Sequence, residues 1–207
     1  MEVMVEPAQQ LTAASGRDGD VDDAALVRRI VAGDDARHDA FRQLYARHAP
    51  DAARFLRRML DDAAAADDAL QETFVRVHRG LREFEPGRPL RPWILGIARH
   101  TALGALRAKQ RAAKLSALGA ADPPDSRTTD DVARTRDTRA RVLEAVAALA
   151  PEHREVVLLR LAHGLVLADV ARALDVTERT VRNRLRAAVV LLERELRRRG
   201  LDQGDLR

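Results

Sequence analysis

The sequence predicts an all-α protein made of two small helical domains joined by a flexible linker. Hydrophobic residues make up 46% of its 207 residues and charged residues 33%, but aromatic residues only 3%. This balance is typical of helices rich in alanine and leucine rather than of strands. Apolar residues recur with a helical period on both sides of one Pro- and Gly-bearing segment. No internal repeat relates the two sides, so they are expected to be different modules.

Helical periodicity predicts five helices in the first half of the chain and a further set in the second. In the first half the stretches are ALVRRIVAG, HDAFRQLYARH, DAARFLRRML, AAADDALQETFVRVHRGL and RPWILGIARHTALGALRAKQR. In the second half they are RVLEAVAAL, PEHREVVLLRLAHG and LADVARALDVTERTVRNRLRAA. In the fourth stretch, Leu70, Phe74, Val77 and Leu81 fall at i, i+4, i+7 and i+11. That spacing places them in one buried stripe of an amphipathic helix.

The expected domain boundaries follow from changes in composition. Residues 1–23 carry acids, Gly and Ser without an apolar period, and are expected to be a disordered acidic tail. Residues 112–137 contain a Pro-Pro pair within a cluster of Gly, Ser, Thr and Asp, which indicates a linker. These segments leave 24–111 and 138–199 as the two domains, and 200–207 as a C-terminal tail.

Composition excludes several classes of function. Cysteine is absent, which excludes disulfides, thiolate nucleophiles and Cys-based zinc sites. Neither a secretory signal pattern nor a run of about 18 apolar residues occurs, so we expect a cytoplasmic protein without membrane insertion. Residues 1–25 carry six acids and one arginine, whereas residues 177–199 carry eight arginines and three glutamates. This asymmetry favours a polyanionic partner for the C-terminal end.

Residues 167–188, LADVARALDVTERTVRNRLRAA, have the pattern of a helix-turn-helix. Val170, Ala171 and Leu174 give a first short helix its apolar face, and Thr177 is placed to cap a second helix. Asp175 stands in the turn, where many such motifs use glycine to reach a left-handed backbone. Aspartate tolerates that conformation better than most residues do.

The second helix of this motif has a basic outer face. Its inward positions are expected to be Val181, Leu185, Ala188, Leu192 and Leu196. With those positions facing inward, the helical period places Arg179, Asn183 and Arg186 on the outward face, with Thr180 and Arg182 beside them. When a helix enters the major groove, arginine can donate to both acceptors of guanine, and asparagine can donate to N7 of adenine while accepting from its N6 amino group. The pattern therefore predicts a DNA-reading helix, with a plain solvated face as the alternative.

A second candidate surface is acidic, because residues 61–72 contain five acids and no base. With the Leu70 stripe buried, the opposite face of that helix holds Asp68, Gln71, Glu72, Val75 and Arg79. A protein interface is the favoured function for this face, and a solvated surface fits about equally well. A metal-dependent nuclease is the enzyme alternative, and it would use Asp61, Asp62, Asp67, Asp68 and Glu72. Side chains on one helix diverge, however, and neither a Walker loop nor an HExxH pair supports it.

The acidic helix is followed by a Pro- and Gly-rich loop, FEPGRPLRPW, and then by a basic helix. The basic residues of that helix are Arg99, His100, Arg107, Lys109 and Arg111. Loop and helix together form a second candidate nucleic-acid surface. Trp93, the only tryptophan, is expected to pack in the core rather than to stack on a base.

Two groups of these segments resemble a known family. FRQLYARHAPDAARFLRRML, ADDALQETFVRVHRGL and RPWILGIARHTALGALR resemble domain two of the bacterial extracytoplasmic-function (ECF) sigma factors of the sigma-70 family. LAPEHREVVLLRLAHGLVLADVARALDVTERTVRNRLRAA resembles their domain four. The resemblance covers about residues 25–199 in the right order across a linker. The alternative function is that of a free-standing helix-turn-helix regulator, but such a regulator has no need of the first module.

The resemblance implies a factor without catalysis or cofactor that directs core RNA polymerase to promoters and assists their opening. Its implied partners are core RNA polymerase, promoter DNA in double-stranded and melted form, and an anti-sigma factor able to hold it near the membrane. The implied polymerase-binding residues are Asp67, Asp68, Gln71 and Glu72. The implied minus-ten residues are Phe84, Glu85, Arg88, Arg91, Arg99, His100 and Arg107. The implied minus-thirty-five residues are Arg179, Thr180, Arg182, Asn183, Arg184 and Arg186.

The chain departs from the common family pattern at several positions. His78 stands where tryptophan is usual, Leu90 where phenylalanine is usual and His100 where asparagine is usual. Asp175 replaces the common turn glycine, and the pair Glu178-Arg179 precedes the Thr-Val pair, where a glycine often does. Promoter preference is therefore a property of this chain and is not carried over from relatives.

Overall fold

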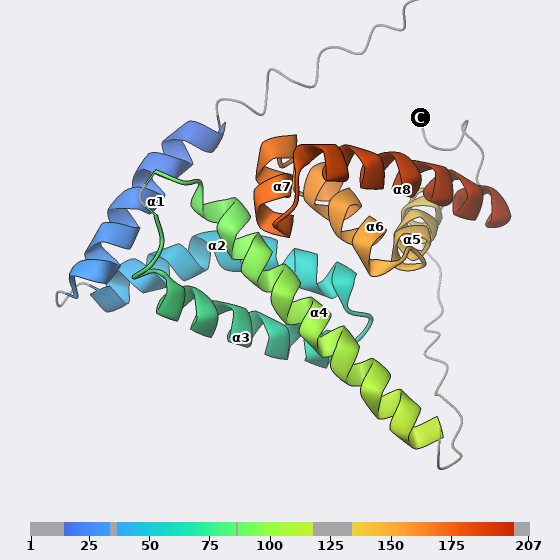
Figure 1. Ribbon diagram of the computed structural model, residues 1–207, viewed down its shortest axis with the longest axis horizontal. Coiled ribbons are helices and arrows are strands. Elements are labelled where there is room, and N and C mark those ends of the chain that lie inside the picture. The colour runs from blue at the N-terminus through green and yellow to red at the C-terminus, as the bar shows by residue number, and fades with distance from the viewer. Residues whose placement is uncertain (1–14, 34–36, 86, 118–133, 201–207) are drawn as a thin grey trace, which may run out of the picture.

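The computed structural model describes residues 15–33, 37–85, 87–117 and 134–200, and within these ranges it contains helices and loops but no strand (Figure 1). In chain order the helices are α1 (Ser15–Ala32), α2 (Arg37–Met59), α3 (Ala63–Gly80), α4 (Leu90–Ala117), α5 (Arg134–Ala147), α6 (Pro151–Val157), the π-helical turn η1 (Leu158–Ala162), α7 (Leu167–Leu174) and α8 (Glu178–Arg198). The all-α expectation is confirmed. None of the helices in these ranges is long and apolar enough to span a bilayer.

Helices α1 to α4 form the first module, in which α2 contacts the other three. Its most buried side chains include Leu44 and Phe55 of α2, Val77 of α3 and Ile94 of α4. Phe74, Val77 and Leu81 are buried and Leu70 is half-buried against them, which confirms the stripe predicted for α3.

The prediction of two separate helices on either side of Pro50 was wrong, because α2 continues through it. A proline inside a helix removes one backbone hydrogen bond and costs about 3 kcal/mol. Leu44 before Pro50 and Phe55 after it are both fully buried on the core side of α2. Each such burial contributes roughly 1.5–3 kcal/mol, which offsets the cost of the proline.

The helix bounds differ from the expected domain limits. Helix α1 begins at Ser15, inside the segment 1–23 that was expected to be a disordered tail, and α4 continues beyond Arg111 to Ala117. Helix α5 begins at Arg134, which also lies inside the expected linker 112–137. Residues 1–14, 118–133 and 201–207, which belong to the expected tails and linker, lie outside the described residues. The buried carboxylate of Asp23 holds α1 against α2. It accepts a hydrogen bond from Arg47 at 2.7 Å and contacts the His48 ring at 2.9 Å.

Helices α5 to α8 form the second module, which contains the expected helix-turn-helix. Val181, Ala188 and Leu196 are buried and Leu185 and Leu192 are half-buried, so the predicted inner face of α8 is confirmed. The turn is also as predicted. Asp175 is left-handed, with φ 54° and ψ 50°, and the Thr177 hydroxyl caps α8 by accepting from the Thr180 N–H at 3.2 Å.

Replacing Asp175 with glycine is expected to stabilise the chain by about 0.5–1 kcal/mol. A left-handed backbone strains residues that carry a Cβ, and glycine relieves that strain. The free energy of unfolding in urea measures the effect. The matched control is Ala168→Gly in the helical backbone of α7, which should lose about 1 kcal/mol. Equal losses in the two variants would contradict this account of the turn.

The two modules pack against each other. Helix α7 lies on α4, while α5, α6 and η1 contact α2 (Figure 1). Gly96 permits a close approach of α7 to α4, because a Cβ at this position would lie 3.0 Å from the backbone oxygen of Ala173. Buried residues of both modules form one continuous apolar cluster. The sequence gives no local sign of this contact.

Candidate nucleic-acid interface

Helix α8 presents an exposed row of hydrogen-bond donors to solvent. Arg179, Arg182, Asn183 and Arg186 are exposed, and Thr180 is half-buried beside the cap. Arg182 pairs with Glu178 one turn earlier at 2.7 Å, with both side chains about half exposed. Exposed pairs of this kind contribute between about 0 and 1 kcal/mol, so Arg182 can exchange this partner for DNA at little cost.

Arg184 points away from this row and towards α6. Its guanidinium donates to Glu155 at 3.0 Å, and its side chain is only 29% exposed. Glu155 also accepts two hydrogen bonds from Arg99 of α4, at 2.6 and 3.3 Å. A carboxylate that is 1% exposed therefore joins one arginine of each module.

The predicted minus-ten residues fall into an exposed and a paired group. Exposed members are Glu85, Arg88, His100 and Arg107. Arg91 donates to Asp51 at 2.6 Å, and Arg99 is held by Glu155 with its side chain 14% exposed. The half-buried Phe84 ring packs on Trp93, with ring centroids 4.9 Å apart, so the predicted packing role of Trp93 is confirmed.

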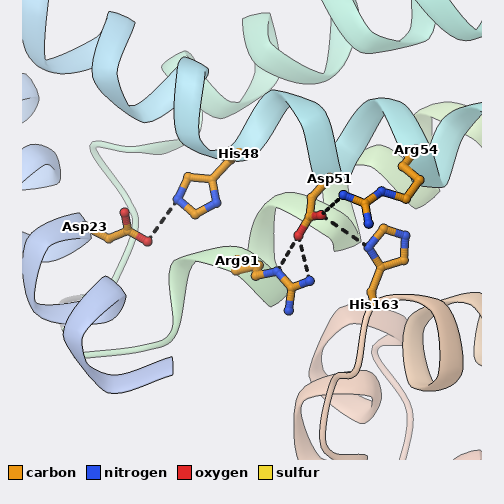
Figure 2. Close-up of polar contacts among 6 residues, drawn as sticks. All are labelled: Asp23, His48, Asp51, Arg54, Arg91 and His163. Carbon is orange, nitrogen blue, oxygen red and sulfur yellow. Dashed lines mark hydrogen bonds and ion pairs between the residues drawn. The ribbon is translucent and has the colours of Figure 1, made fainter. Parts of the chain in front are cut away.

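Asp51 of α2 is the centre of a polar cluster between the modules (Figure 2). It pairs with Arg91 at 2.6 Å and Arg54 at 3.0 Å, and lies 3.9 Å from the Nδ1 atom of His163. Burial alone would raise the pKa of Asp51, but the Arg91 hydrogen bond and the neighbouring positive charges bring it below its usual value. Asp51 is therefore an anion that ties the start of α4 to α2.

His163 belongs to the second module but is buried against the first. Its side chain has no exposed surface and its ring lies 5.9 Å from the Phe55 ring. Within the described part of the chain, neither ring nitrogen has a hydrogen-bond partner. Burial lowers the pKa of His163 to about 4; Asp51 opposes this, and Arg91, Arg54 and Arg58 add to it. The docked ring is therefore neutral at neutral pH.

The chain is expected to lose stability as pH falls from about 6.5 to about 4. Between these values His163 takes up a proton in the unfolded chain, where it is exposed, but not in the folded chain, where it is buried. The loss attributable to this residue reaches roughly 3 kcal/mol at the lower end. His163→Phe keeps the contact with Phe55 and should flatten the dependence, measured by urea unfolding across the window. His38→Phe, at an exposed position, should retain it. Equal slopes in both variants would contradict this role for His163.

Arg154 is a second buried link between the modules. It donates to the backbone oxygen of Met59 at the end of α2 at 3.0 Å, and to those of Leu149 and Ala147. Burial lowers the pKa of Arg154, and Asp61 at 3.9 Å opposes this. Sequence reasoning missed Arg154, Glu155 and His163. Arg154 and Glu155 directly follow Glu152 and His153 in the start of α6, so no local pattern distinguishes them from their polar neighbours.

The acidic face of α3 is exposed, as expected. Asp67, Asp68, Gln71 and Glu72 are all exposed, and Val75 in the same face is 43% exposed. Two ion pairs on this face are weak surface contacts, Asp67 with Arg57 at 3.3 Å and Glu72 with Arg76 at 2.7 Å.

The acids of the nuclease alternative do not converge. Asp62 instead caps α3 by accepting from the N–H groups of Ala64 and Ala65. No group of three His, Cys, Asp or Glu side chains is close enough to hold a metal ion in the part of the chain that the structure describes.

These features define a class of protein, a two-module helical chain with a helix-turn-helix at one end and a separate acidic face at the other. Two family models match it, Sigma-70 region 2 over residues 44–112 and Sigma-70, region 4 over residues 139–192. The RNA polymerase sigma factor CarQ of Myxococcus xanthus is 36% identical over 136 residues, which cover 66% of this chain and 77% of CarQ. The ECF RNA polymerase sigma factor SigL of Mycobacterium tuberculosis is 31% identical over 161 residues, 77% of this chain and 90% of SigL.

A solved structure of CnrH in complex with the cytosolic domain of CnrY is also similar, with a TM-score of 0.63 and 27% identity over 84% of this chain and 97% of CnrH. The chain belongs to the sigma-70 family, as an ECF sigma factor. Such a factor binds core RNA polymerase and promoter DNA and directs transcription initiation to specific promoters; it is not an enzyme.

Proposed function

We propose that three surfaces of this chain divide the work of initiation. The acidic face of α3 binds core RNA polymerase, the loop before α4 together with α4 binds the minus-ten element, and the outer face of α8 reads the minus-thirty-five element. The observation that carries this proposal is the exposed donor row of α8, which consists of Arg179, Arg182, Asn183 and Arg186.

The polymerase surface comprises Asp67, Asp68, Gln71 and Glu72. All four are exposed, and Val75 adds an apolar contact among them. A face of this composition suits a basic partner, because charge complementarity steers association and fixes the register. The weak surface pairs of Asp67 and Glu72 can be exchanged for contacts with the polymerase.

The minus-ten surface comprises the loop residues Phe84, Glu85 and Arg88 and the α4 residues Arg91, Arg99, His100 and Arg107. Opening a promoter requires unstacking of a base, which costs a few kcal/mol and must be offset by a pocket and by phosphate contacts. The loop supplies the aromatic ring and the polar groups for such a pocket, and the exposed Arg88 and Arg107 can contact phosphates.

The minus-thirty-five surface comprises Arg179, Thr180, Arg182, Asn183, Arg184 and Arg186. The cap at Thr177 fixes the start of α8, so the residues that follow it enter a major groove in a fixed register. Arginine and asparagine in that position can make paired hydrogen bonds to guanine and adenine.

We further propose that the chain acts in the cytoplasm and is held inactive by an anti-sigma factor. This proposal is supported by the similarity to CnrH, which was solved in complex with the cytosolic domain of CnrY. The separate polymerase- and DNA-binding surfaces give such a partner two targets.

Transcription from a library of genomic DNA fragments, with core polymerase in the presence and absence of the chain, tests the proposed function. Start sites that depend on the chain should share one sequence near minus ten and another near minus thirty-five. Variants of α8 should shift preference at the upstream element, and variants of the loop at the downstream one. The absence of chain-dependent start sites, or start sites without a shared upstream element, would overturn the proposal.

A further inference from the structure

We infer that His100, Gly104 and Arg107 form a reading site on α4 that selects, at one position of the minus-ten element, a base with an amino group on its major-groove edge. Adenine and cytosine are the two bases of this kind. The inference rests on the proposed function in taking α4 as a minus-ten surface. It goes further by assigning the chemistry of the base that is read.

The ring of His100 is held in one tautomer. Its Nδ1 atom lies 3.2 Å from the backbone oxygen of Gly96. A carbonyl oxygen can only accept, so Nδ1 carries the proton, and the Nε2 atom of the neutral ring is an acceptor. The side chain is exposed, and among the described residues Nε2 has no partner of its own. His100 therefore presents a single acceptor to a molecule that approaches this face of α4.

An acceptor on this face discriminates between bases. On the major-groove edge, adenine N6 and cytosine N4 are amino groups that donate, whereas guanine and thymine present only acceptors. An acceptor that faces another acceptor leaves both atoms without a hydrogen bond, and a polar atom that loses water without gaining a partner is costly. The Nε2 atom of His100 therefore favours adenine or cytosine and rejects guanine and thymine.

Gly104 leaves the backbone of α4 bare one turn after His100. It is exposed in the interior of the helix, and a Cβ there would meet nothing within 4 Å. Glycine inside a helix lowers stability relative to alanine, and no contact among the described residues calls for a glycine here. Because positions four apart share a helix face, the bare backbone lets a DNA strand approach α4 closely beside the His100 ring.

The same face of α4 continues into two arginines. Arg107 and Arg111 follow Gly104 by three and seven residues, which is the spacing of one helix face. Residues 107–114 are all exposed, and this end of α4 projects beyond the other helices (Figure 1). Arginines in such a row contact phosphates and fix the register of a helix on DNA. They hold the strand over Gly104 while His100 meets the edge of the base.

Selection of promoters from a library with a randomised minus-ten region, by core polymerase carrying the chain, tests the base preference. At about pH 8, where free imidazole is neutral, the parent should enrich adenine or cytosine at one position about tenfold over guanine and thymine. His100→Ala should lose the preference at that position alone. His100→Asn should admit guanine there, because its amide can also donate.

The matched control for the selection is Lys109→Ala, an exposed position on the opposite face of α4, which should keep every preference of the parent. If His100→Ala changes no position, or if the parent prefers guanine or thymine at the position that changes, the inference is overturned. Failure of the proposed function looks different, because then no sequence near minus ten is enriched even by the parent.

Removing the amino group from the DNA tests the contact at the level of one hydrogen bond. In a selected promoter, the base at that position is replaced by purine for adenine or by 2-pyrimidinone for cytosine, each of which lacks the amino group. The replacement should weaken binding of the parent complex about tenfold more than binding of the His100→Ala complex. Equal losses in the two complexes would show that the amino group does not meet His100.

Gly104→Ala tests the close approach of the strand separately. The new Cβ has room in the free chain and should raise the midpoint of unfolding in urea. It should nevertheless weaken binding to the selected promoter about tenfold, because it separates the strand from His100. Misfolding cannot produce these opposite effects. Gln110→Ala, an exposed position outside this face, should leave promoter binding unchanged. Unchanged promoter binding in Gly104→Ala overturns the close approach.

Discussion

Reversing two charges on α3, as Asp68→Arg together with Glu72→Arg, is expected to abolish binding to core RNA polymerase. Both side chains are exposed, so the change should alter the free energy of unfolding by no more than about 0.5 kcal/mol. Like charges placed opposite one another at an interface cost several kcal/mol, so we expect a loss of at least about a hundredfold in affinity. Fluorescence anisotropy of the labelled chain titrated with core polymerase measures it.

The matched control reverses two exposed charges in the second module, Glu152→Arg with Glu193→Arg, and changes the net charge equally. This variant should bind core polymerase like the parent. If the α3 variant also binds normally, the polymerase-binding surface lies elsewhere, and the proposal that the acidic face of α3 binds core RNA polymerase is refuted.

Removing the arginines of α8 that are proposed to read bases is expected to weaken promoter recognition at defined positions. Arg182→Ala and Arg186→Ala should each cost the polymerase-bound factor about 1–3 kcal/mol on its own promoter, and should relax its preference at one base pair. Both side chains are exposed on the donor row and cap no backbone group, so folding should be unaffected. Competition between promoters that differ at single upstream positions measures the effect.

Arg194→Ala is the control for this experiment, since it removes an exposed arginine from the same helix well beyond the donor row. It should leave base preference unchanged. A uniform loss on all sequences with Arg182→Ala and Arg186→Ala, together with a shallower dependence on salt, would show that these residues contact phosphates instead.

Local patterns in the sequence predicted the features that depend on neighbouring residues. The stripe of Phe74 and Val77, the cap at Thr177 and the left-handed Asp175 each follow from spacing or from the chemistry of one turn, and each is present. Pro50 was misleading because its local cost is outweighed by burial on both sides of it.

The packing of the two modules could not be predicted in this way. Arg99 and Glu155 are 56 residues apart, and Arg154 reaches the backbone of Met59 across 95 residues. No helical period links such positions, and a buried charge has the same sequence signature as an exposed one. The exposed sites of α3 and α8 were therefore accessible to sequence reasoning, whereas the paired state of Arg91, Arg99 and Arg184 was not.

The most direct test of the account is a map of where each surface lies on a promoter in the assembled complex. Single cysteines introduced at Ala187 on α8 and at Glu83 before the α4 loop can each carry an iron chelate that cuts nearby DNA. In the complex with core polymerase, the chelate at Ala187 should cut around the minus-thirty-five element and the one at Glu83 around the minus-ten element. Cleavage by both chelates at the same element, or cleavage that needs no polymerase, would contradict the division of work between the two modules.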